Sequence, residues 1–317
     1  MMIKKIFVSL LATAVLVALL DLAIGSTLRH FYFTQSSGFQ YRTTYSIDKT
    51  RAQILVFGSS RANHHYVPEV FEGALGRTFY NAGRDGQGIL FHTALLKSIA
   101  KRYAPQIVIL EYDGDFEYRE GGYDKLAALL PYYRDHAELR SIVELKGPFE
   151  KVKLLSQIYP FNSDALSIAV GNSEFNKQRN GDHQGYSPLF GAWSEPIHFA
   201  EANPASRVDA NKVAAFRDFI ATAKAVGARV YVVNSPIYLR FRGAEERNIA
   251  KEICAEAGVD FLDYSRDQRF TADGSLFKDI SHLNSTGATR FSELAAGYIL
   301  RHDQGRGPSV SAAGAAQ

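Results

Sequence analysis

The chain has 317 residues, of which 46% are hydrophobic, and its 36 Lys and Arg against 33 Asp and Glu give a net charge of +3. These values are typical of a globular domain and exclude a disordered chain, a collagen and a coiled coil. Because the basic residues are scattered, without a run of five, charge gives no support for nucleic-acid binding. The single cysteine, Cys254, excludes an internal disulfide framework.

The amino terminus carries a membrane-targeting pattern. Lys4 and Lys5 precede residues 6–20, which are uncharged, and the apolar run resumes after Asp21 and continues to Gly25. About twenty apolar residues span a bilayer, and a charge is tolerated near the interface. The pattern therefore favours an uncleaved anchor over its alternatives, a cleaved signal peptide or a buried terminal helix. Since the lysines come first, we expect the rest of the chain to be extracytoplasmic, on the periplasmic or cell-surface side.

Short apolar runs then alternate with segments of helical periodicity. Strands are expected at 53–57, 77–81, 106–112, 229–234 and 259–262, and helices at 89–103, 209–226, 244–257 and from Ser285 onward. Apolar strands separated by helices predict an α/β protein with a parallel sheet that is covered on both faces. Ligands bind such sheets at the carboxyl ends of the strands.

The expected organisation has an anchor, a spacer, one domain and a tail. The predicted divisions are 1–25, 26–50, 51–302 and 303–317, with the tail disordered and a mainly helical insertion at 114–207 inside the domain. Helices are expected in the insertion near 122–130, 134–145 and 148–157. Its aromatic residues suit either sugar stacking or packing: Tyr123, Tyr132, Tyr133, Tyr159, Phe161, His183, Tyr186, Phe190 and Trp193.

Three loops carry reactive residue types. Ser60 follows the first strand, in a turn that exposes its hydroxyl and places its N–H at a helix start. Glycine-rich residues 81–86 follow the second strand and allow close backbone approach to a ligand. Asp279 lies three residues before His282, so its carboxylate can reach Nδ1 and leave Nε2 free as a base. Each loop taken alone is also compatible with an ordinary turn.

Taken in order, these three loops resemble those of the SGNH (GDSL-like) hydrolase family. Residues 232–236, at the end of the fourth strand, also look like that family. The resemblance covers about residues 52–113 and 208–301. It implies a flavodoxin-like, three-layer fold with a five-stranded parallel sheet.

The resemblance also implies roles for single residues. Ser60 resembles the nucleophile, His282 the general base and acid, and Asp279 the carboxylate that orients the imidazole. The backbone N–H groups of Ser60 and Gly86 resemble two oxyanion donors. No metal and no cofactor is implied. The adjacent pair His64-His65 is interpreted as surface residues, because neighbours in a regular element point in different directions.

The third block of the family is altered in this chain. It normally supplies an Asn side chain as a further oxyanion donor, and Gly114 occupies that place here, while Ser59 replaces the first-block aspartate. One missing donor typically costs roughly 10²–10³ in rate. Four residues near the site are candidates to support the substrate or the oxyanion instead: Arg61, Asn63, Asn81 and Arg84.

The expected chemistry passes through an acyl-Ser60 intermediate. Transfer to a sugar hydroxyl would make the protein an O-acyltransferase, and transfer to water would make it an esterase or deacetylase of surface glycans. A third alternative is a catalytically weak binding component of a polysaccharide export or modification complex. The anchor adds a resemblance to proteins of alginate acetylation and teichoic-acid D-alanylation. That resemblance implies a polysaccharide substrate and a membrane-bound O-acyltransferase as partner.

Overall fold

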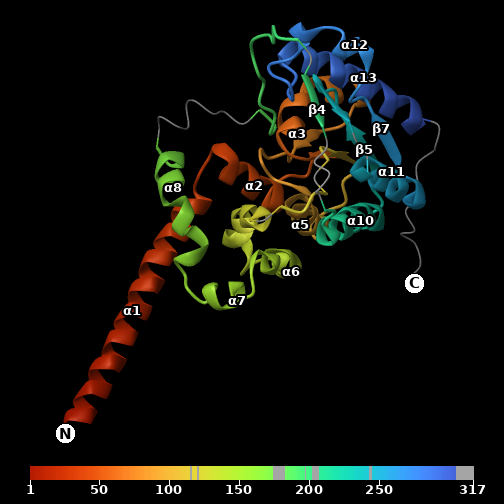
Figure 1. The fold of residues 1–317 in the computed structure, drawn as a ribbon. Helices are drawn as coiled ribbons and strands as arrows, with labels where there is room; N and C mark the ends of the chain where they lie inside the picture. Colours follow the sequence, from red (N-terminus) through yellow and green to blue (C-terminus); the bar gives the residue numbers. More distant parts are fainter. Residues whose placement is uncertain are drawn as a thin grey trace, which may run out of the picture.

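A five-stranded, all-parallel sheet forms the centre of the protein in the computed structural model, which describes residues 1–114, 116–119, 121–173, 183–196, 198–201, 207–242 and 245–304. Figure 1 shows helices on both sides of this sheet. In spatial order its strands are β2 (Phe79–Asn81), β1 (Ile54–Phe57), β3 (Ile107–Glu111), β5 (Arg229–Asn234) and β7 (Asp260–Asp263). Numbered within the sheet, the order is 2-1-3-4-5, as in flavodoxin-like folds. The predicted fold class is confirmed.

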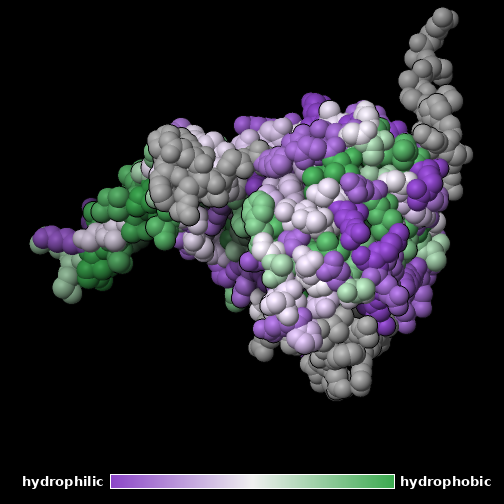
Figure 2. All heavy atoms as spheres, turned by 90° about the horizontal axis from the view of Figure 1, so that it is seen from above, coloured by the Kyte–Doolittle hydropathy of each residue, from purple (hydrophilic) through white to green (hydrophobic). Residues whose placement is uncertain are grey.

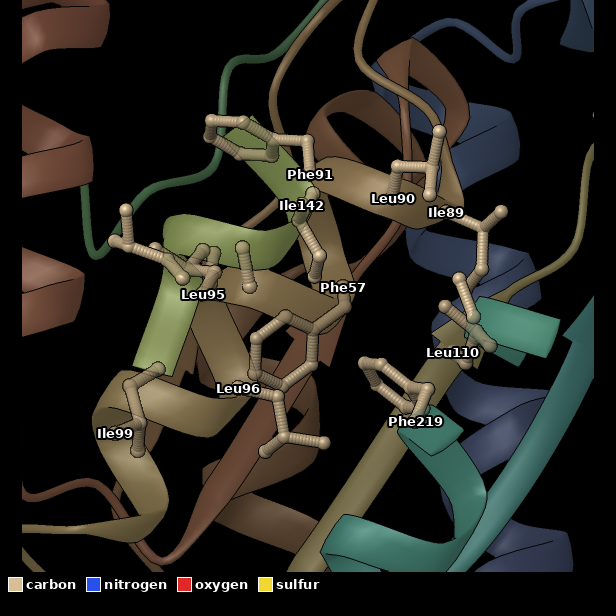
Figure 3. Packing of buried hydrophobic residues seen from close by; sticks show 14 of the residues in the cluster. Phe57, Ile89, Leu90, Phe91, Leu95, Leu96, Ile99, Leu110, Ile142 and Phe219 are labelled. Carbon is tan, nitrogen blue, oxygen red and sulfur yellow. The ribbon is translucent and has the colours of Figure 1, made fainter. Parts of the chain in front are cut away.

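One face of the sheet is covered by α5 (Ile89–Ala100) and α10 (Ala210–Ala225). Figure 3 shows Phe57 of β1 and Leu110 of β3 packed against these helices. The rings of Phe57 and Phe219 meet edge to face, with centroids 5.2 Å apart. Burying each such side chain contributes about 1.5–3 kcal/mol, so this layer is a large part of the core.

The opposite face is covered by α3 (Ser60–His65), α4 (Pro68–Leu75) and α13 (Ser285–Gln304). Phe71 of α4 and Phe291 of α13 are fully buried there. Since successive strand residues point to opposite faces, each apolar strand contributes to both clusters. Burial on both faces explains why the strands are continuous apolar runs in the sequence.

The remaining elements lie at the margins of the domain. Helix α11 (Glu245–Ala257) packs beside β7, while α12 (Gln268–Thr271) and η5 (Gly274–Leu276) lead toward α13. A separate two-stranded parallel sheet pairs β4 (His198–Glu201) with β6 (Leu239–Arg242). Residues 305–317, most of the expected tail, lie outside the described residues.

Helix α1 (Met2–Phe33) projects from the domain, as Figure 1 shows, and α2 (Gly38–Asp48) follows it. Within the described residues, only α1 is both long enough and apolar enough to cross a membrane. Residues 26–50, expected as a spacer, instead form the end of α1 and all of α2 and join the core. Tyr32 is buried there, and its ring lies 6.0 Å from that of Tyr132. Tyr32 is therefore a packing residue, whereas Phe31 is 46% exposed.

The insertion is helical, as expected, but it is broken into short pieces. They are η1 (Gly122–Tyr132), η2 (Ala137–Leu139), α6 (Arg140–Val143), η3 (Glu144–Lys146), α7 (Glu150–Lys153), η4 (Tyr159–Asp164) and α8 (Ala165–Gly171). Pro148 lies in the turn between η3 and α7, Pro160 lies in the first turn of η4 and Pro131 lies near the end of η1, and proline lacks the N–H that a continuing α-helix needs. Most of the aromatic residues expected in the insertion pack against the core, whereas Phe190 is exposed.

Gly58, directly after β1, should tolerate no side chain. Its φ is +139°, and a Cβ there would lie 2.7 Å from Glu111 Cβ. At Gly227, whose φ is +81°, nothing lies within 4 Å of such a Cβ. We expect Gly58→Ala to lower the free energy of unfolding by about 3 kcal/mol or more, from strain plus overpacking. Gly227→Ala, the control, should cost about 1–2 kcal/mol. Equal losses in denaturant unfolding would show that the close approach to Glu111 is unimportant.

Candidate active site

The carboxyl end of the sheet brings together the three side chains predicted to form a triad. Ser60 begins α3 directly after β1, and Asp279 and His282 lie in the loop between η5 and α13. His282 Nε2 lies 2.7 Å from Ser60 Oγ. His282 Nδ1 lies 2.9 Å from both carboxylate oxygens of Asp279. A hydroxyl, an imidazole and a carboxylate are thus hydrogen-bonded in line. Ser60 and His282, which meet in this chain of hydrogen bonds, are 222 residues apart in the sequence.

The hydrogen bonds of Asp279 fix the tautomer of His282. Burial acts to raise the pKa of Asp279, but hydrogen bonds from the N–H groups of Ser281 and His282 and from the imidazole outweigh it, and the pKa is lowered. The two N–H donors lie 2.8 and 3.0 Å from Oδ1. An ionised carboxylate only accepts hydrogen bonds, so Nδ1 carries the proton. The lone pair of Nε2 then faces the hydroxyl of Ser60, as a general base requires.

The backbone around Ser60 leaves two N–H groups available. Throughout the described residues, the N–H groups of Ser60 and Gly86 make no hydrogen bond, whereas Gly83 N–H donates to Asn81 Oδ1 at 2.9 Å. Gly86 has a φ of +73° and is exposed. The two N–H groups expected as oxyanion donors are therefore unoccupied. Gly114, where the family places an Asn, has a φ of +82° and offers no side chain.

Two of the four candidate support residues hold the loop after β2. Asn81 donates from Nδ2 to the carbonyl of Ala62 at 2.7 Å, which ties that loop to α3. Arg84 donates to Thr43 Oγ1 at 2.8 Å, and its guanidinium lies over the ring of Phe39. Both side chains thus bind other parts of the protein.

The other two candidate support residues, Arg61 and Asn63, are buried in α3. Asn63 donates to Asp85 Oδ1 at 2.8 Å and accepts from Arg42 at 3.0 Å. Arg61 donates to Asn234 Oδ1 at 3.0 Å and to carbonyl oxygens of neighbouring strand ends. All four candidates therefore hold the scaffold in this structure, and none of these contacts points a donor at Ser60.

A buried polar network connects three strand ends behind the triad. Glu111, at the end of β3, lies 3.1 Å from the guanidinium of Arg61. It also accepts hydrogen bonds from the hydroxyl of Tyr66 at 2.5 Å and from the N–H and hydroxyl of Ser235 at 3.1 and 2.8 Å. Burial raises the pKa of Glu111, and the charge of Arg61 opposes that effect most. The network therefore holds a carboxylate that is surrounded by donors.

The network reaches the loop of His282 through His65. His65 Nδ1 lies 2.8 Å from Ser235 Oγ, and its Nε2 accepts the N–H of Leu283 at 2.9 Å. Because Nε2 accepts, Nδ1 carries the proton. Burial, and next the charge of Arg61, lower the pKa of His65 well below its ordinary value, so the ring is neutral. Leu283 follows His282 directly, so His65 holds the backbone that presents the imidazole of His282 to Ser60.

The interpretation of His64 and His65 as surface residues is wrong, since both are buried. The ring of His64 lies 5.6 Å from that of His282, at a right angle to it. His64 Nδ1 donates to the carbonyl of Ser187 at 2.6 Å, and Nε2 lies 3.3 Å from Asp85 Oδ2. The helical spacing i, i+4 from Ser60 to His64 was the signal that could have placed His64 at the site.

Asp85 is a second carboxylate beside the triad. Burial acts to raise its pKa, but the hydrogen bonds and charge of His64, the hydrogen bond of Asn63 and the charge of His282 lower it. Its ionised form therefore adds a second negative charge near His282. Sequence reasoning missed this residue, because a lone Asp in a glycine-rich turn is an ordinary turn residue.

Within the part of the chain that the structure describes, no group of three His, Cys, Asp or Glu side chains is placed to bind a metal ion.

Comparison of the sequence with models of protein families and with curated proteins gives no match. The functional conclusion therefore depends on the geometry of the site.

We expect His65 to control the reactivity of Ser60 through the loop of His282. His65→Leu leaves Leu283 N–H buried without an acceptor, whereas His65→Gln can offer Oε1 near the position of Nε2. His65→Leu should slow labelling of Ser60 by a fluorophosphonate probe about tenfold, the equivalent of one hydrogen bond of about 1.4 kcal/mol. His65→Gln should retain most of the rate. A folded His65→Leu protein that is labelled as fast as the wild type would contradict this role.

His65 should also make stability depend on pH. Its pKa is lowered in the folded protein, so the unfolded chain binds a proton, below about pH 6.5, that the folded chain does not. The free energy of unfolding should therefore decrease as the pH falls through this range, by up to about 1.4 kcal/mol per pH unit from this residue. Denaturant unfolding between pH 7.5 and pH 5 should show a shallower decrease for His65→Gln. Parallel curves for the two proteins would mean that His65 takes up its proton in the native state.

Proposed function

We propose that this protein is a membrane-anchored serine O-acyltransferase of the SGNH type that modifies a cell-surface polysaccharide. The observation that carries the proposal is the aligned hydrogen-bond chain from Ser60 through His282 to Asp279. An imidazole that faces a serine hydroxyl and is oriented by a carboxylate is the arrangement that activates serine for acyl transfer.

The reaction would proceed in two steps with His282 carrying the proton. Ser60 Oγ attacks the carbonyl carbon of an acyl ester while His282 Nε2 takes the hydroxyl proton. The oxyanion accepts hydrogen bonds from the N–H groups of Ser60 and Gly86. When the tetrahedral intermediate collapses, the ester bond breaks and the leaving alcohol takes the proton from His282. The acyl group is then bound to Ser60.

The second step regenerates the serine. A hydroxyl group of the acceptor gives its proton to His282 Nε2 and attacks the acyl carbon, and the bond to Ser60 Oγ breaks as that oxygen regains the proton. The absence of a third-block Asn predicts a slower reaction, by roughly 10²–10³, than a complete oxyanion site would give. Activated donors should therefore be needed for turnover to be measured.

The anchor supports a substrate outside the cytoplasm. Helix α1 is long and apolar enough to cross a bilayer, and Lys4 and Lys5 lie at its amino end. Basic residues before a first membrane helix favour a cytoplasmic amino end, which places the domain on the other side. A membrane-bound O-acyltransferase that passes acyl groups outward would supply the donor, as the resemblance to alginate-acetylation and D-alanylation proteins implies.

Hydrolysis is the alternative, and the openness of the site favours it. The side chain of Asp279 is 41% exposed and that of His282 is 22% exposed, so water reaches the triad. An acyl-Ser60 intermediate that meets water before a sugar hydroxyl would give an esterase or deacetylase. Both outcomes depend on the same first step.

Incubation of the full chain with p-nitrophenyl acetate and an oligosaccharide acceptor tests the proposal. We expect acetylated oligosaccharide from the wild type and at least a 10³-fold loss with Ser60→Ala, since the nucleophile is removed. Ser163→Ala, at an exposed serine of the insertion, is the control and should keep full activity. Free acetate without acetylated acceptor would establish the hydrolytic alternative. Turnover that survives Ser60→Ala would exclude both.

A further inference from the structure

Three exposed apolar side chains of the insertion lie in and beside α7 and are named here the apolar collar. They are Phe149, Val152 and Leu155, which are 68%, 64% and 77% exposed. Apolar side chains gathered in this way on a soluble surface usually mark a contact.

The collar lies beside the point where α1 meets the domain. Asp21 of α1 accepts hydrogen bonds from Ser156 Oγ at 2.5 Å, Gln157 N–H at 2.7 Å and Ile158 N–H at 3.2 Å. One turn further, Gly25 packs so closely that a Cβ there would lie 2.3 Å from Gln157 Cβ. The anchor is therefore fixed to the insertion one residue after Leu155. Helix α8 also packs against α1.

The length of the anchor brings the collar to the membrane surface. Residues 6–20 are uncharged and exposed, and in an α-helix fifteen residues extend about 22 Å. The hydrocarbon core of a bilayer is about 30 Å thick, so this stretch alone is too short to span it. Leu22 and Ile24, which are also exposed, continue the apolar surface beyond Asp21. About twenty residues, from Ile6 to Gly25, reach that thickness, so the outer boundary of the hydrocarbon falls near Gly25, where the helix packs against Gln157.

We propose that the apolar collar inserts into the outer interface of the bilayer that α1 spans. Figure 2 shows apolar surface along the projecting helix and a hydrophilic tip at its far end, as a spanning helix requires. In Figure 1, α7 lies on the side of the domain from which α1 projects, and α3, which carries Ser60, lies beyond it. The domain therefore rests on the lipid at a fixed orientation, with the triad held away from the membrane surface.

Apolar contact, rather than charge, supports this attachment. Lys151 is paired with Glu144 at 3.2 Å and Lys153 with Glu150 at 2.8 Å, so neither lysine of α7 offers an uncompensated charge to lipid headgroups. Attachment should accordingly change little with ionic strength, unlike that of a polybasic segment. The proposal is independent of the acyl-transfer chemistry, because it does not involve Ser60.

Site-directed fluorescence in lipid nanodiscs tests the proposal on the full chain. Phe149→Cys and Leu155→Cys are labelled singly with the polarity-sensitive fluorophore NBD, and Phe190→Cys, at a position 70% exposed elsewhere on the domain, is the control. Burial raises the pKa of the native Cys254 thiol to about 12, so it should not compete for the label. The wild-type chain measures any labelling of Cys254 directly.

We expect the labels at positions 149 and 155 to emit at shorter wavelength and to lose most of their emission when the nanodisc contains doxyl-labelled lipid. The label at position 190 should keep its emission, and 1 M salt should change none of these results. Labels at 149 and 155 that behave like the label at 190 would overturn the proposal. That result would indicate that the collar binds a protein partner instead, because nanodiscs made of lipid and this chain contain no such partner.

Discussion

The buried pair of Arg61 and Glu111 is the contact on which the geometry of the site depends. It joins the helix that begins with Ser60 to the end of β3, and through Ser235 to the end of β5. Burying two charges costs free energy unless their remaining hydrogen-bonding groups are satisfied, and here donors surround the carboxylate. The hydrogen bonds of this pair extend through Ser235 and His65 to the loop of His282. We therefore interpret the pair as fixing the positions of these loops rather than as adding to stability.

The site separates groups that would act on a substrate from groups that hold the loops. Ser60, His282 and Asp279 are partly exposed, whereas Arg61, Glu111, His65 and Ser235 are buried and bonded to each other. This division explains how the chain keeps the three side chains aligned although two blocks depart from the SGNH pattern that its loops resemble. A similar division is found where α1 meets the insertion. Asp21 is bonded to Ser156 there, while the neighbouring apolar side chains of the collar are exposed.

The fold could be predicted because it follows from short-range patterns, whereas the triad was predicted from the resemblance of three loops to those of the SGNH family. Apolar runs buried on two faces identify parallel strands, and the ends of such strands must meet at one edge of the sheet. What could not be predicted depends on side chains that turn inward from distant segments. His65 is buried against Ser235 and Leu283, which lie 170 and 218 residues away in the sequence, and Tyr32 is buried against Tyr132 of the insertion. A local sequence pattern does not show which distant residues will come into contact.

The most direct measurement is the mass of the peptide that contains Ser60 after brief reaction of the full chain with an activated acetyl ester and quenching in acid. An activated nucleophile predicts one acetyl group on Ser60 in the wild type and none in His282→Ala, because the imidazole must accept the proton. Acetylation of Ser60 that persists unchanged in His282→Ala, or acetyl groups only on other residues, would contradict the account.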